Sequence, residues 1–429
     1  MKAVIAAGGK GTRLSSIANN IPKPMVLIQE KPILEHQINN LKENGIVDII
    51  LIIGYLGDVI KDYFKDGSKF GVNITYIEER EPLGTAGAFY YLKEQIDNDF
   101  IFLYGDLIFS IDFSKLIQFH LLKQGNITLF AHPNSHPFDS DIIKIDNENC
   151  VQKILKKNEQ RNFYYHNIVN AGIYVLKKQI LDKFLELSKK DFETFVLNDE
   201  IEERNVFAYI SSEYVKDAGT PDRFDQVNID YKNKIIENKN FQKKQKCIFF
   251  DRDGTINKYK GFLRNINDFE LEEGVIECLH FLNNSDYLAI IISNQPVIAR
   301  GEVTFDELDY IHAKLETLLG EKGVYVNKIY FCPHHPDSGF DGEIKELKCT
   351  CDCRKPNIGM IKKAQEFFNL DLDKCYVVGD TTVDIQTGKN AGVKTILVKT
   401  GLAGADKKYN CKPDFIINNI SEITDIIKE

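Results

Sequence analysis

The chain begins with an apolar run at residues 2–7 that leads directly into the stretch AAGGKGTRL at residues 6–14. A glycine-rich turn after a buried strand brings backbone N–H groups to a point that a phosphate can approach closely. Glycine is needed there because a Cβ atom would block that approach. The turn lacks the G-x-x-x-x-G-K-[ST] pattern, so it is not a P-loop. This stretch predicts a central strand and a phosphate-binding turn of an α/β fold.

Further apolar runs continue the pattern through the first half. We expect helices at residues 33–44 and 59–64, and strands at residues 48–53, 73–78, 100–104, 127–131, 171–176 and 206–210. Strands that alternate with helices predict an α/β sheet with parallel strands. The first domain, residues 1–235, is therefore expected to be Rossmann-like.

A second stretch, FFDRDGT at residues 249–255, starts another α/β unit. Its strands are expected at residues 247–250, 288–292, 328–331, 375–378 and 395–398. Residues 236–246 are polar and rich in lysine, which is typical of a linker. The sequence therefore predicts a second domain at residues 247–429.

The bulk composition limits the classes of function. A length of 429 residues suits two domains of about 150–250 residues each. The net charge of -9 disfavours nucleic acid and anionic membranes as partners. There is no run of about 18 apolar residues, which a membrane span needs, and residues 2–7 are too short for a signal peptide. We expect a cytoplasmic enzyme, and the composition leaves a homo-oligomer open.

Charged side chains in the first half suit a nucleoside triphosphate. Arg13 and Lys23 can supply two positive charges to the phosphates. Asp106 follows an apolar strand, where an aspartate commonly holds Mg²⁺, and Asp217 offers a second carboxylate far along the chain. Magnesium prefers a few carboxylates together with substrate phosphate oxygens, so we expect these two aspartates to converge.

Short motifs follow one another in the first half: GGKGTR at 8–13, PKP at 22–24, PLGTAG at 82–87, GD at 105–106, NAGIY at 170–174 and DAGTP at 217–221. In this order they resemble the sugar-1-phosphate nucleotidyltransferases, over residues 1 to about 235. The resemblance implies that Arg13 and Lys23 neutralise the phosphates of the triphosphate and that Asp106 and Asp217 hold Mg²⁺. The residues of the phosphate turn would be Gly8, Gly9, Gly11 and Thr12.

The same resemblance assigns the other substrate contacts. Gly84 and Thr85 would contact the nucleobase, Asn170 and Gly172 the sugar, and Lys157 the sugar phosphate. The tripeptide KKN at residues 156–158 stands where the family usually has Glu-Lys-Pro. The motifs resemble the heptose- and mannose-1-phosphate guanylyltransferase branch, which implies GTP as the nucleotide. The implied reaction is in-line attack by the sugar 1-phosphate on the α-phosphorus, which requires alignment and charge neutralisation.

The second half carries another ordered set of motifs: FFDRDGT at 249–255, SNQ at 293–295, RKP at 354–356 and GD at 379–380. They resemble the haloacid dehalogenase superfamily. The resemblance implies that Asp251 attacks phosphorus, that Asp253 protonates the leaving group and then activates water, and that Mg²⁺ is held by Asp251, Asp253 and Asp380. The implied phosphate and substrate contacts are Ser293, Asn294, Gln295, Arg354 and Lys355. No large insertion follows the first motif, so we expect a minimal cap.

A cysteine cluster lies between these motifs, since four of the nine cysteines fall between Cys332 and Cys353. Such clustering suggests metal before disulfides in a cytosolic enzyme. Cys332, His334, Cys351 and Cys353 supply three thiolates and one imidazole, which match a closed tetrahedral Zn²⁺ site. Cys349 competes with Cys351, and His335 competes with His334.

This loop is similar to two phosphatases of the superfamily, which act on D-glycero-D-manno-heptose 1,7-bisphosphate and on histidinol phosphate. Fusion to a sugar nucleotidyltransferase favours the first, because its product, a heptose 1-phosphate, is a guanylyltransferase substrate. We therefore expect a bifunctional enzyme that makes GDP-D-glycero-α-D-manno-heptose from GTP and sugar phosphates. Alternatives are another sugar such as mannose, another nucleotide, or a first domain that only senses a ligand and regulates the phosphatase.

Overall fold

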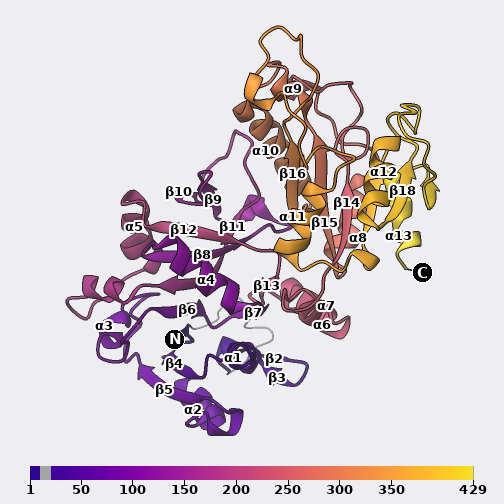
Figure 1. Ribbon diagram of the computed structural model, residues 1–429. Helices are drawn as coiled ribbons and strands as arrows, with labels where there is room; N and C mark the ends of the chain where they lie inside the picture. Colours follow the sequence, from indigo (N-terminus) through magenta and orange to yellow (C-terminus); the bar gives the residue numbers. More distant parts are fainter. Residues whose placement is uncertain (10–20, 429) are drawn as a thin grey trace. The chain divides into compact units, whose positions relative to one another are not determined.

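The computed structural model describes residues 1–9 and 21–428 of the protein (Figure 1). The chain divides into two compact units. The first comprises Met1–His132, Ile143–Lys156 and Ile168–Asn240. The second comprises Pro133–Ile142, Lys157–Asn167 and Phe241–Glu429, so two loops from the first half are grouped with the second half.

Four parallel strands form the centre of the first unit. They are β6 (Phe100–Tyr104), β1 (Lys2–Ala6), β4 (Asp48–Ile53) and β5 (Asn73–Glu78), side by side in that order. Because neighbouring parallel strands end at the same edge of a sheet, the turns that follow β1, β4 and β6 meet there.

The rest of this sheet is mixed and contains antiparallel pairs, which corrects the prediction of parallel strands from the sequence. β11 (Val169–Leu176) runs antiparallel to both β6 and β8 (Ile127–His132), and β12 (Val206–Ile210) pairs in parallel with β8. A parallel connection between adjacent strands needs a long crossover. The chain instead reaches β11 through two short strands, β9 (Ile142–Ile145) and β10 (Val151–Leu155).

Two small ladders accompany the sheet, and the sequence analysis did not predict them. β7 (Leu107–Ser110) pairs antiparallel with β13 (Tyr214–Asp217), and Asp217 lies opposite Leu107. β2 (Leu27–Ile28) pairs with β3 (Lys31–Pro32). The first ladder matters for function, because it places Asp217 beside the end of β6.

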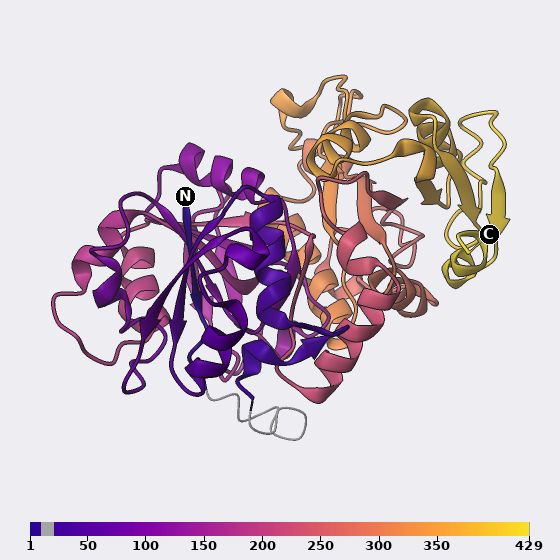
Figure 2. The same ribbon diagram turned by 90° about the horizontal axis from the view of Figure 1, so that it is seen from below.

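Helices cover both faces of the first sheet (Figure 2). One face carries α1 (Ile33–Glu43), α2 (Gly57–Phe64) and α4 (Phe113–Lys123), and the other carries α3 (Phe89–Leu92) and α5 (Asn198–Glu202). Ala3 and Ile5 face one core and Val4 faces the other, as expected for alternating side chains of a doubly covered strand. The helices α6 (Pro221–Lys232) and α7 (Ile235–Asn238) complete the unit.

The second unit is built on one parallel sheet. Its strands lie in the order β16 (Lys328–Cys332), β15 (Tyr287–Asn294), β14 (Lys246–Phe250), β17 (Tyr376–Gly379), β18 (Lys394–Val398) and β19 (Phe415–Ile417). The five strands predicted from the sequence are confirmed, and β19 is additional. Because β14 lies between β15 and β17, the residues that follow these three strands converge.

Helices lie on both faces of this sheet as well. The core on one face includes α8 (Val275–Asn283), α10 (Phe305–Glu321) and α13 (Ile423–Ile426), and the core on the other face includes α11 (Gly359–Phe368). The helices α9 (Pro296–Ala299) and α12 (Thr382–Ala391) begin close to the ends of β15 and β17. Between β14 and α8, the helical structure is the short 3₁₀ helix Ile266–Asp268, in agreement with a minimal cap.

Among the described residues, we find no helix that combines the length and the apolar character needed to cross a membrane.

Candidate active sites

The turn after β1 in the first unit lies against two other glycine turns. A Cβ atom on Gly8 would be 3.3 Å from the backbone nitrogen of Gly54, and one on Gly105 would be 2.9 Å from the carbonyl oxygen of Ala6. The glycines therefore allow the turns after β1, β4 and β6 to come together. Gly9 follows in the same turn, whereas Gly11, Thr12 and Arg13 lie outside the described residues.

The structure brings Lys23, Asp106 and Asp217 together at this edge. Lys23 begins the 3₁₀ helix Lys23–Met25, and its Nζ atom donates a hydrogen bond to Oδ2 of Asp106. The backbone N–H of Ala218 donates to the carbonyl oxygen of Asp106 across 3.1 Å. A Cβ atom on Gly219 would be 3.0 Å from Nζ of Lys23 and 2.7 Å from Oδ1 of Asp217.

An arginine that the sequence analysis missed holds Asp217. Nη1 of Arg223, from the first turns of α6, lies 2.6 Å from Oδ2 of Asp217, and the N–H of Gly219 donates to Oδ1 across 3.0 Å. Burial would raise the pKa of Asp217, but Arg223, Gly219 and Lys23 outweigh it and the pKa is lowered. Asp217 is therefore a carboxylate at neutral pH. Two aspartates that converge beside a lysine fit a Mg²⁺ ion that also binds phosphate oxygens.

The predicted nucleobase loop is fixed against a distant segment. Gly84 has φ +78°, and a Cβ atom on it would be 2.4 Å from the carbonyl oxygen of Lys190. Thr85 donates from Oγ1 to Asp191 across 2.8 Å and accepts from the N–H of Phe192 across 2.7 Å. Gly84 and Thr85 therefore dock this loop against residues 190–192.

Glu79 lies between the two loops and was not singled out by the sequence. Its Oε2 atom would be 3.0 Å from a Cβ atom on Gly8, and its carboxylate accepts the backbone N–H of Leu83. Oε1 is buried and has no hydrogen-bond partner among the described residues. Burial raises the pKa of Glu79 to about 7, although the hydrogen bond from Leu83 opposes the change.

The residues predicted for the sugar lie on β11. Asn170 donates from Nδ2 to the hydroxyl of Tyr174 across 2.7 Å, and its Oδ1 accepts the N–H of Gly172 across 3.1 Å. Gly172 has φ +78°, and a Cβ atom there would be 2.6 Å from the ring of Tyr104. The bulge in β11 at these residues therefore aims the Asn170 amide and two tyrosines at one place.

The adjacent residues Lys156 and Lys157 have different surroundings. Lys156 forms an ion pair with Glu193. Burial raises the pKa of Tyr104, and the negative charge of Glu193 adds to this effect. Lys157 has an exposed side chain, and its backbone N–H donates to Oδ1 of Asp141 across 2.9 Å. The motif predicted Lys157 for the sugar phosphate, whereas the lysine that the structure pairs with a carboxylate is its neighbour, Lys156.

The second unit gathers three carboxylates around one ammonium group. Asp251 follows β14, Asp380 follows β17 and Asp384 lies in α12, and their carboxylate oxygens lie within 4.8 Å of one another. Nζ of Lys355 lies 2.6 Å from Oδ1 of Asp251 and 2.6 Å from Oδ1 of Asp384. All four side chains are buried. The single ammonium group of Lys355 faces three carboxyl groups, so it offsets only part of their negative charge.

This excess of negative charge fits a divalent cation. Oδ1 of Asp380 is buried without a hydrogen-bond partner among the described residues, while Oδ2 accepts the N–H of Leu402 across 2.6 Å. Burial, with repulsion from Asp251, raises the pKa of Asp380 to about 8. Burial also raises the pKa of Asp251, with Lys355 opposing the change. A Mg²⁺ ion would satisfy the unpartnered oxygen and stabilise the ionised forms of both groups.

Asp253 is oriented by three side chains, two from its own loop and one from the loop after β15. Nη2 of Arg252, which is fully buried, lies 2.9 Å from Oδ2 of Asp253, and Nε2 of Gln295 donates to the same oxygen across 2.8 Å. Asn257 donates to Oδ1 across 3.1 Å. Gln295 also donates to Oγ of Ser293 across 2.7 Å. The resemblance assigned Gln295 to the substrate, but here it contacts Asp253, and the sequence analysis missed Arg252 and Asn257.

The phosphate-binding loop is anchored by its backbone. Asn294 accepts the N–H of Lys355 across 2.9 Å and donates from Nδ2 to the carbonyl oxygen of Lys355 across 3.0 Å. Nη1 of Arg354 donates to the carbonyl oxygen of His334 across 3.0 Å. Asn294 therefore positions Lys355 against Asp251, and Arg354 ties the loop to the cysteine cluster.

Cys332, His334, Cys351 and Cys353 come together in the structure, with their ligand atoms within 4.8 Å of one another. The Sγ atoms of Cys332 and Cys351 lie 3.4 Å apart, and Nδ1 of His334 lies 3.4 Å from Sγ of Cys353. Tetrahedral ligation with Zn–S bonds of about 2.3 Å would separate two sulfurs by roughly 3.8 Å, so the cluster fits Zn²⁺. Cys349 and His335 are outside this group of four. Nε2 of His335 instead lies 3.1 Å from Nη2 of Arg300.

Comparison with known families identifies both halves. Residues 2–234, more than half of the chain, match the nucleotidyl transferase family, and residues 352–423 match the HAD-hydrolase-like family. The chain belongs to the nucleotidyl transferase family, and its second half belongs to the haloacid dehalogenase-like phosphatases. Both halves are therefore of enzyme families.

Individual relatives each match one half of the chain. The D-glycero-beta-D-manno-heptose-1,7-bisphosphate 7-phosphatase of Salmonella typhi is 36% identical over 184 residues, which cover 43% of this chain and 95% of that protein. The D-glycero-alpha-D-manno-heptose 1-phosphate guanylyltransferase of Campylobacter jejuni is 38% identical over 225 residues, which cover 52% of this chain and 97% of that protein. In the crystal structure of HddC from Yersinia pseudotuberculosis, the sequence is 29% identical and the TM-score is 0.47. The match covers 54% of this chain and 99% of the HddC chain.

Proposed function

We propose that the protein catalyses two consecutive steps of sugar-nucleotide synthesis. The second unit would remove the 7-phosphate of D-glycero-D-manno-heptose 1,7-bisphosphate, and the first would join GMP from GTP to the resulting heptose 1-phosphate. One observation carries the proposal. A single chain matches nearly the whole length of two relatives, a heptose bisphosphate phosphatase and a heptose 1-phosphate guanylyltransferase. The phosphatase relative is named for a reaction that leaves a heptose 1-phosphate, and the transferase relative is named for a heptose 1-phosphate of the other anomer.

In the phosphatase step, a carboxylate oxygen of Asp251 attacks phosphorus and the bond from phosphorus to the C7 oxygen breaks. Asp253 gives its proton to the leaving alkoxide. Asp253 then accepts a proton from water, whose oxygen attacks the aspartyl-phosphate and releases inorganic phosphate. Arg252 and Gln295 support this role because they hold the Asp253 carboxylate in place. Lys355 would bind the transferring phosphoryl oxygens.

In the transferase step, a phosphate oxygen of the heptose 1-phosphate attacks the α-phosphorus of GTP, and the bond to the β-phosphate breaks with release of pyrophosphate. Lys23 and Arg13 would bind the phosphates, while Asn170 and Gly172 would orient the sugar. The reaction needs no nucleophile from the protein, so its rate depends on alignment and charge neutralisation.

Two metals complete the proposal. Mg²⁺, held by Asp106 and Asp217 in the first unit and by Asp251, Asp253 and Asp380 in the second, would neutralise phosphate charge during both reactions. Zn²⁺ bound by Cys332, His334, Cys351 and Cys353 would be structural, because the four ligands close the coordination sphere. Thiolates that must stay reduced, and a nucleotide substrate, suit the cytoplasm.

GTP is the proposed nucleotide and a heptose the proposed sugar. A buried base edge without its hydrogen-bond partner costs about 1–3 kcal/mol, so a wrong base should lower efficiency roughly tenfold or more. Competition between GTP, CTP, UTP, dTTP and ATP at equal concentration tests this choice. Preference for another nucleotide would refute the GDP-heptose assignment but leave the sugar nucleotidyltransferase activity.

The two-activity proposal is tested by variants that separate the steps. Asp251→Asn should abolish phosphate release from the bisphosphate, while pyrophosphate release from GTP and heptose 1-phosphate continues. Lys23→Ala should give the reverse pattern, and Lys31→Ala, whose side chain is exposed and paired with Glu35, is the matched control. Loss of both activities in a folded Asp251→Asn protein would contradict two independent sites.

A further inference from the structure

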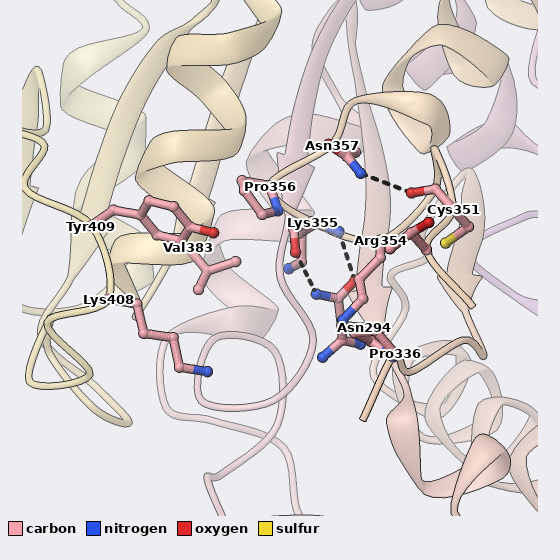
Figure 3. Close-up of a pocket in the computed structure, with 11 residues that line it drawn as sticks. Asn294, Pro336, Cys351, Arg354, Lys355, Pro356, Asn357, Val383, Lys408 and Tyr409 are labelled. Atoms are coloured by element: carbon pink, nitrogen blue, oxygen red, sulfur yellow. Dashed lines mark hydrogen bonds between the residues drawn. The ribbon is translucent and has the colours of Figure 1, made fainter. Parts of the chain in front are cut away.

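A pocket opens beside Lys355 in the second unit. It has a volume of about 270 Å³, and Asn294, Arg354, Lys355, Lys408 and Tyr409 are among its lining residues. Figure 3 shows Lys408 and Tyr409 on one side and Arg354 with Asn294 on the other, with the Lys408 side chain extended toward that second side. The pocket therefore adjoins the phosphoryl site. One of its walls is formed by Lys408 and Tyr409, which the sequence did not predict as catalytic residues.

The charges of this pocket are unbalanced. Lys355 is neutralised by Asp251 and Asp384, which leaves it little charge for a second ligand group. The Arg354 guanidinium donates to a backbone carbonyl, not to a carboxylate, and no ion pair of Lys408 occurs in the part of the chain that the structure describes. None of the described residues that line the pocket is acidic. Two cations that face a shared space favour an anionic ligand.

Lys408 is held by its backbone. Oγ1 of Thr382, at the start of α12, accepts the N–H groups of Lys408 and Tyr409, each across 3.1 Å. Asp406 in the same loop accepts the N–H of Thr382 across 2.8 Å and its hydroxyl across 2.6 Å. This clamp ties the loop to the helix that carries Asp384, so the position of Lys408 is fixed relative to the reacting centre.

We propose that Lys408, together with Arg354, binds the second phosphate of a sugar bisphosphate, the one that is not removed. The inference rests on the proposed function of the second unit, because it needs a substrate with two phosphates. A phosphate offers several acceptor oxygens to an ammonium and a guanidinium group at once, and such charge-assisted bonds are about twice as strong as neutral ones. Lys408 would thereby select bisphosphates over monophosphates, without taking part in phosphoryl transfer.

The test compares kcat/KM for heptose 1,7-bisphosphate and heptose 7-phosphate in the full-length protein. Lys408→Ala should lower the ratio of the two values by about 10-fold to 100-fold, mostly through KM, as expected for loss of one charge-assisted hydrogen bond. Lys408→Arg should restore most of the ratio. Lys412→Ala, an exposed lysine a few residues further on that does not line the pocket, is the control.

Equal losses on both substrates, or an unchanged ratio in a folded Lys408→Ala protein, would overturn the proposal. If the wild-type protein releases no phosphate from heptose 1,7-bisphosphate, the proposed function fails on its own. The same ratio is then measured with fructose 1,6-bisphosphate and fructose 6-phosphate. A fall in Lys408→Ala would still support the second phosphate site, and no fall would refute it.

Discussion

Gly254 lies directly against Asp380, and a Cβ atom on Gly254 would be 2.5 Å from Oδ2 of that aspartate. Gly254 also has φ +87°, a conformation that side chains rarely adopt. The two residues follow the adjacent strands β14 and β17, so the glycine after the two motif aspartates leaves room for the carboxylate of the neighbouring strand. This contact explains why the motif needs glycine at that point.

Gly254→Ala should therefore damage the phosphatase site itself. We expect phosphate release to fall at least about 100-fold, because a shift of roughly 1 Å in a reacting group can cost that much. Gly392→Ala is the matched control, since Gly392 has φ +72° but open space around its Cβ position. It should cost about 1–2 kcal/mol of stability and leave phosphate release nearly intact. Equal activity in the two variants would show that Asp380 tolerates displacement.

The cysteine cluster predicts one Zn²⁺ per chain. Cys351→Ser should lose the metal and weaken phosphate release, because structural zinc contributes directly to local folding and Arg354 contacts the His334 carbonyl oxygen. Cys349→Ser should keep the metal, since Cys349 is exposed and outside the cluster. Metal analysis of protein purified under reducing conditions provides the measurement. Absence of zinc, or the opposite behaviour of the two serine variants, would refute the ligand set.

Glu79 predicts a pH-dependent stability of the first unit. Its pKa is raised from 4.5 to about 7 in the folded protein, mainly by burial. The folded state therefore favours protonated Glu79, and this contribution is present below about pH 4.5 and is lost as the pH rises through about 7. Glu79→Gln should increasingly exceed the wild type in stability between pH 5 and pH 8.

Hydrogen exchange of the amides in β1 and β4, without nucleotide, measures this difference at each pH. Glu78→Gln is the control, because the neighbouring Glu78 is exposed and paired with Lys61. A constant difference between Glu79→Gln and the wild type across this range would mean that Glu79 is ionised throughout.

The proposed order of reactions predicts the anomer of the bisphosphate. Hydrolysis at C7 breaks no bond at C1, so the heptose 1-phosphate keeps the configuration of its precursor. The guanylyltransferase relative is named for the alpha 1-phosphate, whereas the Salmonella phosphatase is named for the beta bisphosphate. We expect this phosphatase to prefer the alpha bisphosphate. Comparison of kcat/KM for the two anomers tests this, and a preference for beta would break the link between the steps.

The sequence predicted those parts of the sites that follow directly from parallel strands. Asp251, Ser293 and Asp380 end neighbouring strands or follow them, so their convergence is a consequence of the fold. The cysteine ligands were equally predictable, because their spacing and residue types suit few roles other than a metal site.

Contacts between distant side chains were not predictable in this way. Arg252 is a fully buried arginine, and a motif gives no sign that it is held by Asp253 and Gln295. Arg223 reaches Asp217 only because α6 begins beside the end of β13. The mixed strand directions of the first sheet also depend on β9 and β10, which connect β8 to β11. These strands are too short to show a clear alternation of apolar and polar residues in the sequence.

A single reaction mixture shows whether the protein carries out both steps in sequence. The protein is incubated with D-glycero-α-D-manno-heptose 1,7-bisphosphate, GTP and Mg²⁺, and phosphate, pyrophosphate and the sugar nucleotide are measured separately. We expect one phosphate and one pyrophosphate for each GDP-heptose, with phosphate released first. The same mixture with Asp251→Asn should give neither pyrophosphate nor GDP-heptose. Pyrophosphate release from the bisphosphate by that variant, or phosphate release by the wild type without any GDP-heptose, would contradict it.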